Sequence, residues 1–212
     1  MSENTVPVSG SAKKSVGTEL TVESETVGIE LPSAETSALA ETGRLKIRQF
    51  CESDLNDLWA IMRKPEVMYA WESGFTKEET QEWLDRQYNR YNRDGYGYFA
   101  VILKESDRLI GQAGLMTNEI GGETVVEIGY IFDDAVWGQG YAIEAARACV
   151  DLAFDRFGLR RLYATIRPEN MASVKLAEKL GMRKTGRYVK VYQGKEMTHD
   201  IFVLQNIREG SL

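Results

Sequence analysis

The first 43 residues differ in pattern from the rest of the chain. They are rich in Ser, Thr, Glu and Val, contain no aromatic residue, and show no sustained helical or strand-like spacing of apolar positions. Such a segment cannot bury enough apolar surface to offset the conformational entropy that it would lose on folding. We therefore predict a disordered, acidic N-terminal tail over residues 1–43 and one folded domain over residues 44–208.

Regular patterns begin near Arg44 and predict one strand followed by two helices. In RLKIRQF (44–50), apolar residues alternate with basic ones, which is typical of a strand. Ser53 is a candidate N-cap of a helix with one apolar stripe, and Pro65 ends that helix. Thr76 begins the second helix with Glu79 three residues later, which is the sequence pattern of a capping box.

Three strand patterns and a third helix follow. The strands are joined by the short polar links ESD and IGGE, which predict hairpins. After the third of these strands, Gly138 and Gly140 make a turn, and apolar residues then recur at helical spacing up to Phe157. The strand segments are YFAVILK (98–104), RLIGQAGLMTNE (108–119) and TVVEIGYIFD (124–133).

The last part of the chain predicts a strand, a short helix and two more strands. These segments are RLYATI (161–166), PENMASVKLAEKLGM (168–182), TGRYVKVY (185–192) and EMTHDIFVLQN (196–206). Only the stretch from strand 124–133 through the glycine turn to strand 161–166 has the pattern of a parallel crossover. The element order predicts an α+β (α/β three-layer) fold, in which about four helices flank a mixed, mostly antiparallel central sheet of about seven strands.

Composition excludes several classes of protein. Residues 1–43 hold 2 of the 26 basic and 7 of the 32 acidic residues, so the predicted domain is nearly neutral and has no nucleic-acid footprint. No apolar run is long enough to span a bilayer and no signal-peptide core is present, so we expect a cytoplasmic protein with no membrane partner. Cys51 and Cys149 are expected to be free thiols, and with one histidine and no paired cysteines we expect no metal site.

The glycine turn admits more than one function. A dinucleotide-binding fingerprint is excluded because Ile143 stands where G-x-G-x-x-G/A needs its third small residue. A P-loop is excluded because no Gly-Lys-Ser/Thr opens the helix. Two interpretations remain: the glycines make a plain strand-to-helix turn, or they leave backbone N–H groups at a helix N-terminus that bind a pyrophosphate.

Three segments follow one another along the chain in an order that is typical of one protein family: EIGYIF (127–132), WGQGYA (137–142) and RPENMASVKLAEKLGMRKTG (167–186). Together they resemble the GNAT superfamily of acetyl-CoA-dependent N-acetyltransferases. WGQGYA is similar to the family's acyl-CoA loop Q/R-x-x-G-x-G/A, with Trp137 in place of Gln or Arg. EIGYIF looks like the family's central strand, which implies a sheet splayed at strand 4. The resemblance implies acetyl-CoA as co-substrate, bound by Trp137, Gly138, Gln139, Gly140, Tyr141 and Ala142.

The resemblance also implies further site residues. Ile131 and Phe132 of the splayed strand would pair with the pantetheine amides, and Asn170 and Ser173 match the family's N-x-x-S beside the pantetheine arm. Asn170 is equally an ordinary N-cap residue, and the two roles are compatible. SDLNDLWAIMRKPEVMYAW (53–71) and GKEMTHDIFVL (194–204) look most like the RimJ/RimL branch of ribosomal-protein-alanine acetyltransferases, and a homodimer is compatible with this resemblance.

The expected reaction needs a base, because an amine is largely protonated near neutral pH and must lose a proton before it attacks a thioester. Glu127, on the strand beside the acyl end, is our candidate, with Glu196 and His199 of the final hairpin as rivals. The alternative for Glu127 is a side chain that points to solvent or pairs with a basic neighbour. By resemblance, Ser173 would stabilise the departing thiolate, and a backbone N–H of the splayed strand would stabilise the oxyanion.

These residues predict acetyl transfer to a primary amine by direct attack in a ternary complex. Neither cysteine lies in a nucleophile context, so no covalent acyl-enzyme is expected. The acceptor, a protein N-terminus or a small-molecule amine, would lie between the first two helices and the last hairpin. There Tyr69, Trp71 and Phe75 form an aromatic wall or simply pack together, and Glu196 and His199 lie opposite. The alternative function is a non-catalytic module that binds or senses acyl-CoA.

Overall fold

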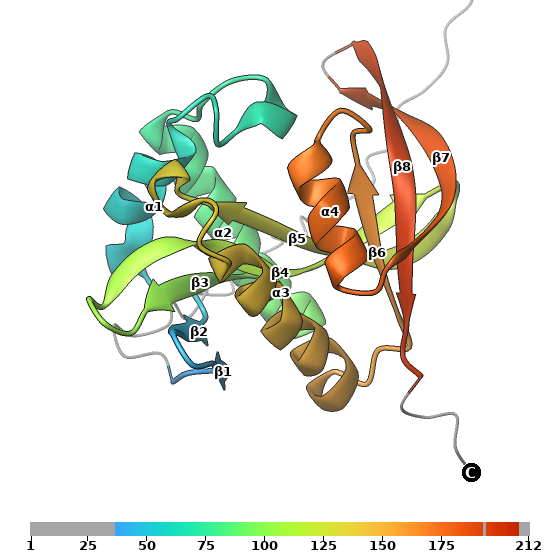
Figure 1. The fold of residues 1–212 in the computed structure, drawn as a ribbon. Coiled ribbons are helices and arrows are strands. Elements are labelled where there is room, and N and C mark those ends of the chain that lie inside the picture. The colour runs from blue at the N-terminus through green and yellow to red at the C-terminus, as the bar shows by residue number, and fades with distance from the viewer. Residues whose placement is uncertain (1–36, 193, 208–212) are drawn as a thin grey trace, which may run out of the picture.

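Eight strands form one sheet in the part of the chain that the structure describes. The computed structural model describes residues 37–192 and 194–207, with the strand order β1-β2-β3-β4-β5-β6-β8-β7 (Figure 1). Neighbouring strands are antiparallel except β5 and β6, which are parallel. The strands are β1 (Ala40–Glu41), β2 (Leu45–Arg48), β3 (Tyr98–Leu103), β4 (Arg108–Ile120), β5 (Glu123–Phe132), β6 (Arg161–Ile166), β7 (Arg183–Tyr192) and β8 (Lys195–Gln205).

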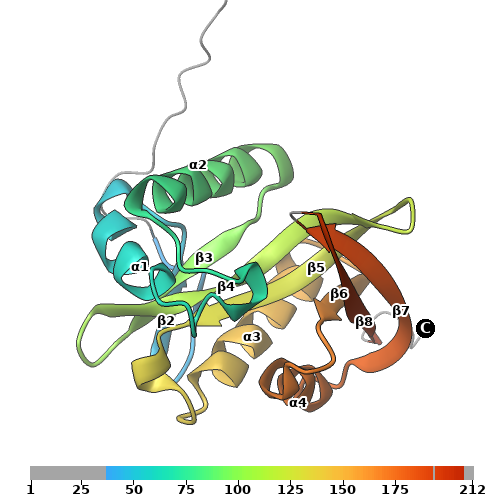
Figure 2. The same cartoon turned by 90° about the horizontal axis from the view of Figure 1, so that it is seen from above.

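Helices cover both faces of this sheet. Figure 2 shows α1 and α2 on one side and α3 and α4 on the other, which confirms the predicted three-layer α+β architecture. No helix in the described residues is long and apolar enough to cross a membrane. The helices are α1 (Leu55–Met62), α2 (Lys77–Asp94), α3 (Tyr141–Asp151), which continues into a π-helical turn (Leu152–Arg156), and α4 (Met171–Lys179). Short 3-10 turns are η1 (Glu52–Asp54), η2 (Tyr69–Trp71) and η3 (Asp134–Val136).

The sheet begins before the position that the hydrophobic pattern indicated. Strand β1 pairs with β2, and the N–H of Leu39 donates to the carbonyl of Ile47 over 2.8 Å. Main-chain hydrogen bonds to β2 hold this short strand, so it needs no hydrophobic period of its own. The sheet therefore has one strand more than predicted. Apart from residues 37–43, the predicted tail lies outside the described residues.

Local hydrogen bonds decide where the first two helices begin. The predicted capping box is confirmed, because Thr76 Oγ1 accepts from the N–H of Glu79 (3.1 Å) and Glu79 Oε2 accepts from the N–H of Thr76 (2.7 Å). The prediction that Ser53 caps the first helix is wrong. Ser53 lies inside η1, where Asp54 accepts from the N–H of Cys51 over 2.9 Å, and α1 starts only after this turn.

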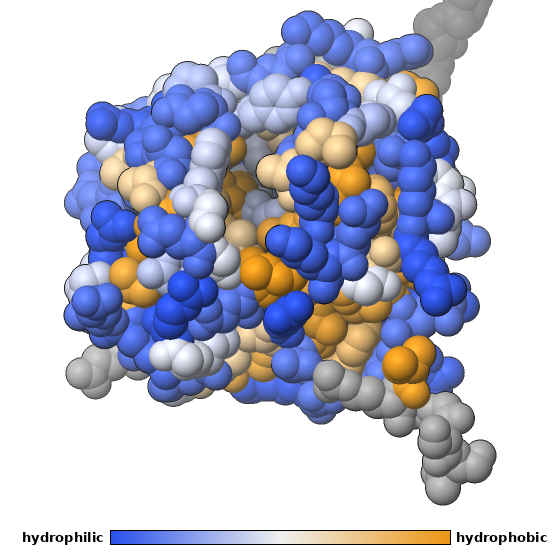
Figure 3. Space-filling view, in the orientation of Figure 1, coloured by the Kyte–Doolittle hydropathy of each residue, from blue (hydrophilic) through white to orange (hydrophobic). Residues whose placement is uncertain are grey.

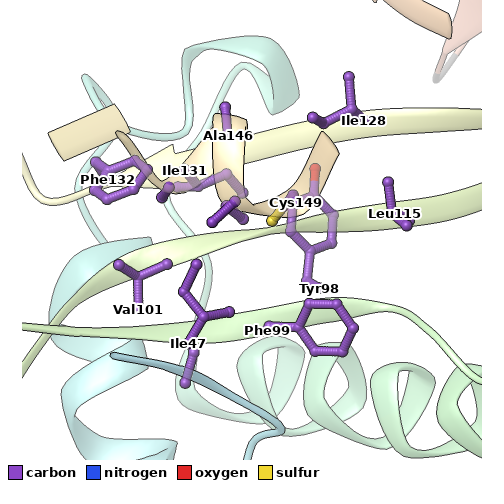
Figure 4. Close-up of a cluster of buried hydrophobic side chains, with 14 of the residues drawn as sticks. Ile47, Tyr98, Phe99, Val101, Leu115, Ile128, Ile131, Phe132, Ala146 and Cys149 are labelled. Atoms are coloured by element: carbon purple, nitrogen blue, oxygen red, sulfur yellow. The ribbon is translucent and has the colours of Figure 1, made fainter. Parts of the chain in front are cut away.

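Strand β5 is held tightly on one side and loosely on the other. It forms ten registered pairs with β4, but in the described residues it shares only the pair Glu127–Tyr163 with β6. The predicted splay at the fourth strand is therefore present at β5. Figure 4 shows buried side chains of β5 and α3 in one cluster, among them Ile131, Phe132 and Cys149. This common core fixes both ends of the glycine turn that joins β5 to α3.

Candidate functional site

The turn between β5 and α3 leaves a row of backbone N–H groups unengaged. Gly138 and Gly140 have φ angles of 76° and 83°, a left-handed conformation that is unfavourable for residues with a side chain. In the described residues no hydrogen bond is found from the N–H groups of residues 138–143. The first satisfied N–H of α3, which begins at Tyr141, is that of Glu144 (3.2 Å to the carbonyl of Gly140). A Cβ at Gly138 would meet nothing within 4 Å. The donors are therefore open to an anion at the positive end of the helix dipole.

Side chains from distant segments hold this turn in shape. The indole N–H of Trp137 donates to the carbonyl of Phe132 over 2.9 Å and ties the turn to the end of β5. Arg44 donates from Nη1 to the carbonyl of Gln139 over 3.0 Å and forms a salt bridge with Glu144 at 2.6 Å. Sequence reasoning missed Arg44, because its partner Gln139 lies 95 positions away along the chain.

The outer edge of β5 exposes main-chain groups. In an antiparallel ladder, successive residues direct these groups alternately to one neighbouring strand and to the other. The N–H of Asp133 donates toward β4, to the carbonyl of Ile110, over 3.0 Å. The alternation therefore directs Ile131 to β4 as well, whereas Tyr130 and Phe132 point to the side where β6 has splayed away. Of the two predicted pantetheine partners, Phe132 lies on the open edge, and Tyr130 takes the place expected for Ile131.

Helix α4 lies beside this open edge. The hydroxyl of Tyr130 donates to the carbonyl of Ser173 over 3.2 Å. Burial raises the pKa of Tyr130 to about 12, although a hydrogen bond with the Ser173 side chain acts in the opposite direction. Asn170 is the N-cap of α4, since its side-chain oxygen accepts from the N–H of Ser173 over 3.1 Å. Ser173 thus contacts the part of β5 that lacks a strand partner, and Asn170 caps the helix that carries Ser173.

Glu127 is buried within β5. It is 7% exposed, and Asn118 donates a hydrogen bond to its carboxylate. The alternative of a solvent-facing Glu127 is therefore wrong. Burial is the main cause of the raised pKa values of Tyr98 and Tyr188, and the negative charge of Glu127 raises both further. Glu127 is thus a carboxylate in a poorly hydrated, aromatic environment, with its neighbour Ile128 on the opposite face of the strand as predicted.

The final hairpin brings His199, and not Glu196, to the face of the sheet that carries Glu127. Glu127 pairs with Tyr163 of β6, which in turn pairs with Val203 of β8. Side chains alternate between the faces along a strand, so His199 shares the face of Val203 and Glu196 lies on the other face. The two rivals for the role of base are therefore separated by the sheet.

His199 is half-buried and held in place. Its Nδ1 lies 3.0 Å from the carbonyl oxygen of Met197, and its ring centroid lies 5.7 Å from that of Tyr188. Burial is the largest cause of its lowered pKa. The imidazole is therefore uncharged at neutral pH and able to accept a proton.

The predicted aromatic wall is in part a packing cluster. Trp71 and Phe75 lie edge to face with ring centroids 6.3 Å apart, and both pack against Trp83 of α2. Tyr69 differs, because it is 43% exposed and the guanidinium of Arg167 lies 4.8 Å from its ring centroid. Tyr69 can meet a ligand, and Trp71 and Phe75 support the loop that carries it.

A groove of about 320 Å³ opens between this loop, the β6–α4 connection and the last hairpin. Glu72, Arg167 and Glu196 are among its lining residues. The ammonium of Lys195 lies 2.8 Å from the carboxylate of Glu72, so an ion pair joins the two sides of the groove. In Figure 3 the surface is hollowed between the half that carries α1 and the half that carries α4. The groove lies where the acceptor was predicted to bind.

Neither a metal site nor a reactive thiol is found in the described part of the chain. No group of three or more His, Cys, Asp or Glu side chains there could hold a metal ion. Burial raises the pKa of Cys149 to about 12, so this thiol does not ionise near neutral pH. Cys51 is buried as well.

Comparison with known proteins shows which family has this arrangement. The sequence model described as "Acetyltransferase (GNAT) domain" matches residues 44–183. The chain belongs to the GNAT acetyltransferases. GNAT proteins transfer an acyl group from acetyl-CoA, so the open turn and the splayed strand β5 belong to an acetyl-CoA-dependent fold.

Among the GNAT relatives, "uncharacterized protein YkkB" of Bacillus subtilis is 36% identical over 163 residues, which are 73% of this chain and 94% of that protein. "Uncharacterized N-acetyltransferase YnaD" of the same species is 35% identical over 150 residues, 70% of this chain and 85% of that one. A solved structure of RimL, a ribosomal L7/L12 alpha-N-protein acetyltransferase in complex with coenzyme A, has a TM-score of 0.67 and 18% identity over 80% of this chain and 98% of that chain. At this identity only the fold is shared, so the RimJ/RimL branch stays a prediction.

Proposed function

We propose that this GNAT protein transfers the acetyl group of acetyl-CoA to a primary amine by direct attack in a ternary complex. The main support is the row of unengaged N–H groups at residues 138–143, next to the open edge of β5. A diphosphate bound there gains charge-assisted hydrogen bonds of about 1.5–3 kcal/mol each. Any helix start leaves its first N–H groups without an intrahelical partner, and here the left-handed Gly138 and Gly140 extend that row by the N–H groups of residues 138–140.

The remainder of the co-substrate then follows the open edge of β5. The main-chain groups of Tyr130 and the N–H of Phe132 are offered to the amides of the pantetheine arm, as an added strand would take them, whereas the carbonyl of Phe132 already accepts from Trp137. Asn170 and Ser173 of α4 flank the arm. Trp137, which replaces the family's Gln or Arg, supports the turn through its hydrogen bond to Phe132.

The acid–base chemistry is assigned to residues near the acyl end. Glu127 removes a proton from the ammonium, and His199 on the same face is the second candidate base. The amine lone pair then forms the C–N bond, and the carbonyl π electrons move to the oxygen, where a main-chain N–H of β5 stabilises the oxyanion. Collapse breaks the C–S bond, and the surplus proton on the nitrogen passes to the departing coenzyme A thiolate. Ser173 donates a hydrogen bond to this thiolate, because a hydroxyl is too weak an acid to transfer its proton fully.

The acceptor enters through the groove bordered by Glu72, Arg167 and Glu196, with Tyr69 at its rim. We place the protein in the RimJ/RimL branch on the resemblance of residues 53–71 and 194–204, and protein N-termini are therefore the first acceptors to test. Small-molecule amines are the second class.

Two measurements test co-substrate and acceptor separately. Isothermal titration with acetyl-CoA should give saturable heat, and absence of heat at millimolar concentration would refute the co-substrate assignment. Mass spectrometry should then detect an added acetyl group after incubation with peptides that carry free N-termini, diamines or amino sugars. Saturable binding with no product from any amine would favour the acyl-CoA-binding module instead.

A pair of variants tests the base. Glu127→Gln should leave acetyl-CoA affinity intact and lower kcat about 10²- to 10⁴-fold, the usual contribution of a general base. Glu123→Gln is the matched control, because Glu123 lies on the same strand but is exposed. Unchanged turnover in Glu127→Gln would shift the role to His199.

A further inference from the structure

The hydroxyl of Tyr98 reaches the reaction face of β5 from two strands away. Tyr98 of β3 pairs with Gly114 of β4, and Gly114 pairs with Gly129 of β5. A Cβ at Gly129 would lie 2.1 Å from the hydroxyl oxygen of Tyr98, so the tyrosine occupies the place of a side chain on β5. Figure 4 shows the ring of Tyr98 extending from β3 across β4 toward β5.

The side chain of Tyr98 is buried, and its hydroxyl has no hydrogen-bond partner in the described residues. Tyr98 is 3% exposed. Its main chain is hydrogen-bonded, because its N–H donates to Gln87 over 3.0 Å and its carbonyl accepts from Tyr91. In the described residues, however, no hydrogen bond of its side-chain hydroxyl is found. An unsatisfied buried hydroxyl is unfavourable, so such a group needs an explanation. The side-chain groups that are fully enclosed without a partner there are Trp59 Nε1 and the hydroxyl of Tyr88. The Tyr98 hydroxyl is not among them, so it keeps access to solvent or to a ligand.

Tyr98 is also held rigidly and stays protonated. Its ring packs on Trp83 with centroids 5.3 Å apart. Burial and the nearby charge of Glu127 both raise its pKa. It is therefore a hydrogen-bond donor at neutral pH, positioned on the same face of the sheet as Glu127.

The length of the co-substrate brings its thioester to this hydroxyl. This step rests on the proposed function. The pantetheine arm has about as many backbone bonds as four residues of an extended chain, which span about 13 Å at about 3.3 Å per residue. With the diphosphate end of the arm taken at Asp133, the first residue after β5, four residues back along the strand end at Gly129. The acyl group therefore lies at the residue whose side-chain position Tyr98 fills.

We propose that the Tyr98 hydroxyl donates a hydrogen bond to the acetyl carbonyl oxygen of the bound thioester. When the amine that Glu127 has deprotonated attacks, the C–N bond forms and the π pair moves to the carbonyl oxygen. On collapse the C–S bond breaks, and the surplus proton on the nitrogen passes to the departing thiolate. The same hydrogen bond strengthens as this oxygen becomes an oxyanion, and Tyr98 keeps its proton throughout. Gly129 is required as glycine because any side chain there would displace the donor.

The test uses Tyr98→Phe, which retains the ring and removes only the hydroxyl. Tyr88→Phe is the matched control, because Tyr88 also carries a buried hydroxyl without a partner, but on α2. The first readout is the infrared band of acetyl-CoA labelled with carbon-13 at the acetyl carbonyl. Binding to the wild-type protein and to Tyr88→Phe should lower its frequency, and binding to Tyr98→Phe should not. The second readout is kcat, which should fall about 10²-fold in Tyr98→Phe, as for loss of one oxyanion donor, with acetyl-CoA affinity unchanged.

The outcomes separate this inference from the proposed function. An identical carbonyl band in all three proteins, or unchanged turnover in Tyr98→Phe, overturns the assignment of Tyr98. A lower melting temperature of Tyr98→Phe with an unaltered band also overturns it, because the hydroxyl would then act only in folding. The infrared measurement requires no acceptor, so it tests Tyr98 independently of amine acetylation. If the wild-type protein acetylates no amine, and the shift of the carbonyl band seen in the wild type is absent in Tyr98→Phe, the proposed function is contradicted and the assignment of Tyr98 is supported.

Discussion

Replacing Gly138 with Ala should weaken acetyl-CoA binding while the domain stays folded. Gly138 has a φ of 76°, and a methyl group in this left-handed conformation costs about 1–2 kcal/mol. The methyl itself meets no atom within 4 Å, so no steric term is added in the free protein. For a domain of this size, about 1 kcal/mol corresponds to a melting temperature lower by about 2–4 °C. The variant should therefore fold.

Gly138→Ala should lower the free energy of acetyl-CoA binding more than it lowers the free energy of unfolding. A backbone that relaxes away from the left-handed region turns N–H groups of residues 138–143 away from the diphosphate. Loss of one hydrogen bond to a charged group, about 1.5–3 kcal/mol, raises the Kd for acetyl-CoA about 10- to 150-fold. Isothermal titration measures this change, and thermal unfolding measures the change in stability on the same samples.

Gly95→Ala is the matched control for backbone strain. Gly95 has a φ of 79° at the end of α2, and a Cβ there also meets nothing within 4 Å. It should show a similar loss of melting temperature with wild-type affinity for acetyl-CoA. The reasoning fails if Gly138→Ala binds acetyl-CoA as the wild type does, or if Gly95→Ala weakens binding equally.

Three further changes follow from the contacts of the site. Trp137→Phe keeps an aromatic ring but removes the indole N–H that donates to the carbonyl of Phe132, a bond worth about 0.5–1.5 kcal/mol. Titration should therefore show acetyl-CoA affinity about 2- to 10-fold weaker, and unaltered affinity would mean that this bond does not support the turn. Ser173→Ala should lower kcat about 10- to 150-fold with unchanged Kd if the hydroxyl stabilises the thiolate, and a steady-state assay that finds wild-type kcat removes that role. Burial lowers the pKa of His199 below its usual 6.5, so the unfolded chain binds the proton more tightly than the folded chain does. The stability that the uncharged His199 contributes is therefore complete above about pH 6.5, and it is lost as the pH falls through the lowered pKa. Denaturant unfolding of His199→Gln should therefore show a smaller loss of stability between pH 7.5 and pH 5.5, and an identical loss would contradict the direction of this shift.

The sequence predicted best those features that depend on hydrogen bonds between residues close together in the chain. The capping box of α2 depends on Thr76 and Glu79, which are three positions apart, and the structure contains both of its hydrogen bonds. The N-cap prediction for Ser53 failed because of one adjacent residue. Asp54 accepts a hydrogen bond from the N–H of Cys51, so a 3-10 turn forms at this position and α1 begins after it. Strand β1 was missed, since its main chain is held by β2 and its own side chains carry no pattern.

The amino-acid sequence by itself determined the turn between β5 and α3, because a left-handed backbone at Gly138 and Gly140 is a property of residues without a side chain. The tertiary structure decided which groups surround that turn and the acyl end. Whether His199 or Glu196 shares a face with Glu127 depends on strand register across β6 and β8, and a slip of one residue would reverse the answer. Register is set by the whole core, through contacts between residues that are distant in sequence, so no local pattern contains it.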